Sequence, residues 1–65
     1  MTKKEIITEL DKRLRMYESY IEHWHNIATY SKNNSESDTA VVVREYYKGK
    51  AHATSEAIKV ITGER

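Results

Sequence analysis

The sequence predicts an all-α fold, a two-helix antiparallel hairpin, from three observations. Apolar residues recur at alternating three- and four-residue spacing over residues 7 to 28, the period of an amphipathic helix. The only dense run of turn-forming residues lies at 31–38, and the chain has no proline. Residues 42–61 then resume the helical period. We therefore expect one domain, 1–65, with a helix over 3–31, a loop over 32–37 and a helix over 38–62.

The first predicted helix begins with a capping box. Thr2, followed by Glu5 three residues later, can satisfy free backbone amides at the start of the helix. The main apolar row of this helix comprises Ile7, Leu10, Leu14, Tyr17, Ile21, Trp24 and Ala28. Ile6, Tyr20 and Ile27 flank the row on one side, so the helix can touch more than one neighbour.

The second predicted helix carries two adjacent apolar rows. Ser37 or Asp38 can cap its start, and Gly63 marks its end. One row comprises Val42, Tyr46, Gly49, Ala53, Ala57 and Val60, and the other comprises Val43, Tyr47, Thr54, Ile58 and Ile61. Together they span an arc of about 180°, wider than a single partner helix covers. The opposite, solvated side is expected to hold Arg44, Glu45, Lys48, His52, Glu56 and Lys59.

The small residues of the first row predict how the two helices pack. Gly49 costs about 1 kcal/mol of helix propensity relative to Ala, so we expect it to serve a close contact, opposite Tyr20. This arrangement leaves the second row free for another chain. The predicted dimer interface comprises Val43, Tyr47, Ile58 and Ile61. A homodimer forming a four-helix bundle is the expected assembly.

The sequence shows no pattern that supports catalysis. His23 and His25 point about 200° apart on a helix and cannot share a metal ion. Glu18 and Glu22 have no inward Glu-x-x-His partner, so a solvated face explains them. There is no cysteine and no phosphate-binding glycine loop. We predict no enzymatic activity, no catalytic residues, no metal and no cofactor.

Composition also constrains the compartment and the partner. Eleven basic residues against ten acidic ones argue against a general polyanion binder. No apolar stretch approaches the roughly 20 residues of a membrane span, and the N-terminal residues lack the apolar core of a signal peptide. We expect a cytoplasmic protein with no membrane partner.

Five tyrosines and one tryptophan supply the candidates for recognition, because aromatic rings with polar tips suit protein interfaces. Tyr17 and Trp24 are assigned to the core, whereas Tyr20, Tyr46 and Tyr47 divide between core and partner contact. Tyr30 lies near the loop and off the main row, and Lys50 lies within the apolar arc. Lys50 either extends from the seam to solvent or awaits an acidic group. The predicted partner-binding residues are Tyr20, Tyr30 and Lys50.

The segment Tyr46-Tyr47-Lys48-Gly49-Lys50, followed by Ala53 and Glu56-Ala57-Ile58, carries a resemblance. It resembles small uncharacterised helical-hairpin proteins of phages and mobile elements in low-GC Gram-positive bacteria. The resemblance implies a regulator that binds a host or phage protein, and it transfers no functional residues. The overall plan is similar to Rop, a small plasmid RNA-binding dimer of helical hairpins, although no motif of its RNA-binding face is present.

Two functions follow as expectations. The first is a small non-enzymatic regulatory or inhibitory protein that acts through protein–protein interaction, phage-encoded and directed at a host or defence protein. The alternative is a Rop-like dimeric RNA- or DNA-binding helical bundle, in which dimerisation duplicates Arg44, Lys48 and Lys59 into a basic stripe. A purely structural component ranks third.

Overall fold

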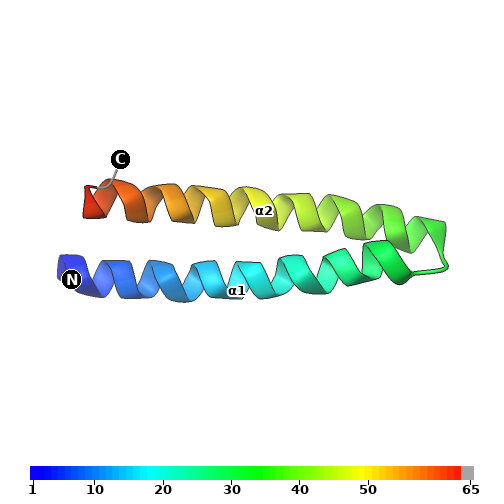
Figure 1. Cartoon of the computed structure of the whole chain (residues 1–65), viewed down its shortest axis with the longest axis horizontal. Helices are drawn as coiled ribbons and strands as arrows, with labels where there is room; N and C mark the ends of the chain where they lie inside the picture. Colours follow the sequence, from blue (N-terminus) through cyan, green and yellow to red (C-terminus); the bar gives the residue numbers. More distant parts are fainter. Residues whose placement is uncertain (64–65) are drawn as a thin grey trace.

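A computed structural model describes residues 1–63 as two long antiparallel helices joined by a short turn (Figure 1). Helix α1 spans Lys3–Tyr30 and α2 spans Asn34–Thr62. The N-terminus and the end of α2 lie side by side at one end of a rod of 47 × 18 × 14 Å. The predicted all-α helical hairpin is confirmed.

The predicted start of α1 and the predicted end of α2 are both observed. The Thr2 hydroxyl accepts a hydrogen bond from the Glu5 amide at 3.1 Å, and the Glu5 carboxylate accepts one from the Thr2 amide. At the C-terminal end of α2, Gly63 adopts a left-handed backbone conformation with φ 75°. Glycine tolerates this conformation because it has no Cβ atom to clash. Its amide donates to the carbonyl oxygens of Lys59 and Val60, so it closes α2.

The turn differs from the sequence prediction, because α2 begins four residues earlier than expected. The Asn33 side chain caps α2, accepting a hydrogen bond from the Glu36 amide at 3.1 Å. Ser37 and Asp38 therefore lie inside the helix and do not cap it. Asn is as good an N-cap as Ser or Asp, and the earlier cap adds a helical turn of hydrogen bonds. The connection shortens from the predicted 32–37 to residues 31–33.

The two apolar rows of α2 have the reverse of the roles that the sequence predicted for them. The row predicted to meet α1 is mostly exposed: Val42 is 69% exposed, and Tyr46 and Val60 are each 58% exposed. A Cβ placed on Gly49 meets no atom within 4 Å, so Gly49 does not face Tyr20. The pairing of Gly49 with Tyr20 was wrong. Ala57, at the border of this row, is half-buried.

The row predicted to bind a second chain instead packs against α1. Ala40, on the same helical face, has no exposed surface and is the one fully buried residue in the range 1–63. Tyr47 lies against Tyr17 and Tyr20 of α1. The half-buried positions of this face include Val43, Tyr47, Ala51, Thr54, Ile58 and Ile61. The predicted dimer interface of Val43, Tyr47, Ile58 and Ile61 is therefore the intramolecular seam of the hairpin.

Candidate interaction surface

Four tyrosines from both helices form a continuous aromatic cluster along one edge of the hairpin. We call Tyr17, Tyr20, Tyr46 and Tyr47 the aromatic cluster. Tyr47 is its centre, with its ring 6.1 Å from Tyr17, 5.0 Å from Tyr20 and 5.3 Å from Tyr46. These separations suit stacked and edge-to-face aromatic pairs. The cluster therefore joins the half-buried Tyr17 and Tyr47 to two tyrosines that solvent reaches, Tyr20 and Tyr46.

Lys50 extends the aromatic cluster with a positive charge. Its Nζ atom lies 5.0 Å from the centre of the Tyr46 ring, within the range of a cation–π contact. The pKa of Lys50 is raised, chiefly by hydrogen bonding to Tyr46 and secondarily by the electrostatic effect of that residue. The side chain thus leaves the seam along an aromatic ring, and its charged end stays accessible to an acidic group on a partner.

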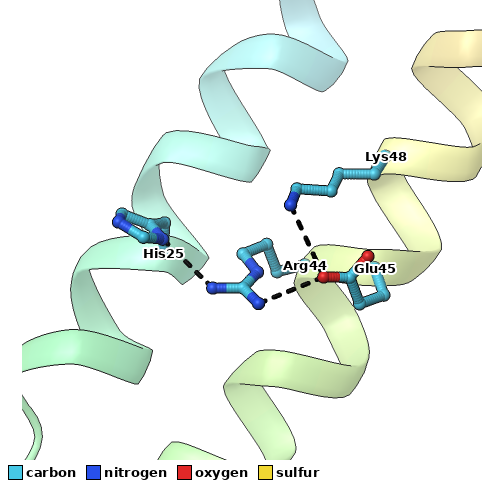
Figure 2. Close-up of polar contacts among 4 residues, drawn as sticks. All are labelled: His25, Arg44, Glu45 and Lys48. Carbon is cyan, nitrogen blue, oxygen red and sulfur yellow. Dashed lines mark hydrogen bonds and ion pairs between the residues drawn. The ribbon is translucent and has the colours of Figure 1, made fainter.

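The opposite edge of the hairpin carries a polar cluster of four residues, His25, Arg44, Glu45 and Lys48 (Figure 2). Arg44 donates from one terminal nitrogen to Nδ1 of His25 on α1, at 3.1 Å. Its other terminal nitrogen donates to Glu45 Oε1, also at 3.1 Å, and Lys48 approaches the same oxygen at 3.5 Å. The contact between Arg44 and His25 therefore joins the two helices.

Arg44 makes the central contacts of the polar cluster. Its guanidinium group can only donate, so Nδ1 of His25 is the acceptor in the contact between the helices. The hydrogen bond from Arg44 is the largest cause of a lowered pKa for Glu45, and Lys48 adds to this lowering. The Nε atom of Arg44 is buried and has no hydrogen-bond partner in the described structure. Arg44 is therefore held between the helices by its terminal nitrogens alone.

The three predicted nucleic-acid contacts do not form a free basic stripe. Arg44, expected on the solvated side of α2, turns toward α1, and its side chain is only 19% exposed. The prediction that Arg44 points outward was wrong, because α2 is rotated about its axis so that the side carrying Arg44 faces α1. Lys48 is paired with Glu45 at 3.5 Å, and Lys59 with Glu56 at 3.9 Å. Each of the three cations thus has a carboxylate beside it.

The predicted partner-binding residues fall at two places. Tyr20, which is 39% exposed, and Lys50 both belong to the edge that carries the aromatic cluster. Tyr30 is 78% exposed and lies about 15 Å further along α1, close to the turn. Sequence reasoning left Tyr46 undecided, and the structure gives it a surface position beside Lys50. Ala40 and Ala51 lie on the same face as the predicted second row of α2. With them included, that row continues without a gap from residue 40 to residue 61, a signal that the sequence already carried.

Other chemistry has little support within residues 1–63. No three His, Cys, Asp or Glu side chains come close enough together to bind a metal ion in this range. Neither α1 nor α2, as far as the structure describes them, has a stretch apolar and long enough to cross a bilayer. No protein-family model, curated protein or solved structure matches the chain.

Proposed function

We propose that this chain is a small non-enzymatic regulator or inhibitor that acts by binding another protein. The observation that supports the proposal is the aromatic cluster, which brings the exposed Tyr20 and Tyr46 onto one edge with Lys50. Tyrosines held by neighbouring rings lose little side-chain entropy on binding, and such residues dominate the binding energy of protein interfaces. Tyr30 supplies a second exposed anchor near the turn.

The partner that fits this edge is a protein surface with apolar pockets and an acidic residue. The rings of Tyr20 and Tyr46 offer apolar area and hydroxyl groups, and the charge on Lys50 favours a carboxylate. The cations of the nucleic-acid alternative are each paired with a carboxylate, and pairing weakens the release of counterions from phosphates. A Rop-like RNA- or DNA-binding role is therefore the second-ranked function.

The resemblance of residues 46–58 to phage and mobile-element proteins supports the rest of the proposal. On that basis the chain is phage-encoded and acts in the cytoplasm on a host or defence protein.

Capture from a bacterial lysate, with and without nuclease, tests the proposal. We expect nuclease-resistant capture of one protein. For that purified partner, Tyr20→Ala and Tyr30→Ala should each weaken binding by roughly 2 kcal/mol, whereas Lys48→Ala should have a small effect. Tyr30 is so exposed that its loss leaves the fold intact. Helical circular dichroism of both variants controls for folding.

Salt dependence separates the two functions. Protein binding through aromatic anchors should weaken only modestly between low and physiological salt. Nuclease-sensitive capture, a steep linear fall of log affinity with log salt, and larger losses for Lys48→Ala and Lys59→Ala than for the tyrosine variants would contradict the proposal and favour the nucleic-acid function.

A further inference from the structure

The outward face of α2 is an apolar row without a partner in the hairpin. We call Val42, Tyr46, Gly49, Ala53 and Val60 the outer row; all five are exposed. We propose that the outer row binds a second copy of this chain, with the two α2 helices antiparallel and related by a two-fold axis level with residues 51–52. This inference goes beyond the proposed partner-binding edge, with which the outer row shares Tyr46.

The exposed surface of the chain is larger than a compact monomer of its mass presents. The accessible surface is 4947 Å². A typical folded monomer of 7.6 kDa exposes about 4,300 Å². The excess of roughly 650 Å² approaches the ~800 Å² that each partner buries in a standard protein interface.

Four of the five residues of the outer row form two pairs that are symmetric about residue 51, and Tyr46 has no counterpart in the row. Val42 and Val60 lie nine residues on either side of residue 51, and Gly49 and Ala53 lie two residues on either side of it. A two-fold axis at this level places Val42 beside Val60 of the second copy and Gly49 beside Ala53 of the second copy. The small residues at the centre allow close approach of the two helices, and the valines fill the ends.

The charged residues beside the outer row lie at equal distances on either side of residue 52, and their signs reverse across it. Along one flank of α2 the order is Glu45, Lys48, His52, Glu56 and Lys59. A two-fold axis at residue 52 places Glu45 opposite Lys59 of the second copy, and Lys48 opposite Glu56 of the second copy. In an antiparallel pair the same flanks of the two helices meet, so four ion pairs of opposite charge form around the axis.

The apolar row and the charged flank therefore locate the same axis independently. Their centres differ by one residue, a rise of about 1.5 Å, which lysine side chains easily span. A parallel pair would bring the charged flank against the other flank of α2, which within the described residues carries only Lys50 and, in the first turn, Glu36. The antiparallel pair thus adds contacts of opposite charge between the chains to the Glu45–Lys48 and Glu56–Lys59 pairs within each chain. Because the outer row faces away from α1, the four helices would form one layer, whereas the sequence predicted a four-helix bundle closed through Val43, Tyr47, Ile58 and Ile61.

Single-cysteine variants test the direction of the pair, since the chain has no native cysteine. We expect a mixture of Val42→Cys and Val60→Cys chains to form a mixed disulfide dimer under mild oxidation, and neither variant alone to cross-link efficiently. In a parallel pair residues 42 and 60 would be about 27 Å apart, far beyond the roughly 7 Å limit between Cα atoms of a disulfide. Cross-linking of each variant with itself, without mixed dimers, would overturn the antiparallel arrangement.

Sedimentation equilibrium tests the surface itself. The unmodified chain should have twice its 7.6 kDa mass at micromolar concentration. Ala53→Glu, which places a charge at the centre of the outer row, should weaken the dimer by roughly tenfold or more, while the helical circular dichroism is retained. The matched control is Ser19→Glu, on an exposed position of α1, and it should leave the mass unchanged. A folded monomer at these concentrations, or a dimer insensitive to Ala53→Glu, would overturn the proposal.

Discussion

The Ser37 hydroxyl donates a 2.7 Å hydrogen bond to the backbone carbonyl of Ala28 and so joins the first turns of α2 to the last turn of α1. Carbonyls in the last turn of a helix have no partner within the helix, so this bond satisfies one of them from outside. The Asn33 cap and the Ser37 bond together close the turn within residues 31–33. The short connection then determines which face of α2 meets α1.

Replacing Ser37 with Ala should lower the free energy of unfolding by about 1 kcal/mol, because the partly buried Ala28 carbonyl loses its partner. Ser35→Ala is the matched control: Ser35 is exposed on the same helical turn, and its hydroxyl makes no hydrogen bond in the described structure. Both changes raise helix propensity similarly, so urea denaturation of the two variants isolates the hydrogen bond. Equal stability of the two variants would contradict the proposed role of Ser37.

Replacing Tyr47 with Ala should be the most destabilising of the tyrosine changes in the aromatic cluster. The ring contacts Tyr17 and Tyr20 across the seam and Tyr46 on its own helix, so its loss should cost about 2–3 kcal/mol. Tyr46→Ala removes a mostly exposed ring and should cost less than about 1 kcal/mol. Thermal unfolding at low protein concentration measures both. A larger loss for Tyr46 would place the seam on the other row.

Replacing Gly49 with Ala should stabilise the hairpin by about 0.5–1 kcal/mol. The added Cβ meets no atom within 4 Å, and alanine restricts the unfolded chain more than glycine. The reverse change at the exposed Ala53 should destabilise by a similar amount and serves as the control. Both are measured by thermal unfolding at low concentration. A lower melting temperature for Gly49→Ala would show that the position is packed against a neighbour.

Replacing Arg44 with Gln should raise the pKa of Glu45 toward its ordinary value of 4.5, because Arg44 is the largest cause of the lowered value. The lowered pKa in the folded state means that the Glu45 carboxylate stabilises the fold above pH 4.5. This stabilisation is lost as the pH falls through the lowered pKa. Titration of the Glu45 carboxyl carbon by NMR measures the shift. Arg13→Gln, which affects a cation paired with Glu9 on α1, should leave Glu45 unchanged.

Local sequence signals predicted much of the architecture. The capping box at Thr2 and Glu5, the left-handed Gly63 and the two helical segments depend on interactions between residues close in the chain. The start of α2 was predicted four residues too late, because several residues between 31 and 38 are good caps and local sequence does not rank them. Long-range packing of Ser37 against Ala28 favours the earlier cap.

The candidate surface was predicted only in part. Tyr20 and Lys50 were identified from residue type and periodicity, and the structure brings them to one edge. The contact of Arg44 with His25 joins residues 19 positions apart, on different helices. Helical periodicity orders residues around one helix, but it says nothing about the rotation of a second helix against it.

By itself, the sequence determined an all-α hairpin with an amphipathic first helix, because 3.6-residue periodicity and caps are local properties. Only the tertiary structure decided which of the two apolar rows of α2 becomes the seam. The inward row carries more large apolar side chains, among them Ile58 and Ile61, so burial favours it as the seam. The three-residue turn and the packing of Tyr47 on Tyr17 and Tyr20 accompany this orientation, which turns Arg44 inward and leaves Val42, Gly49 and Val60 at the surface.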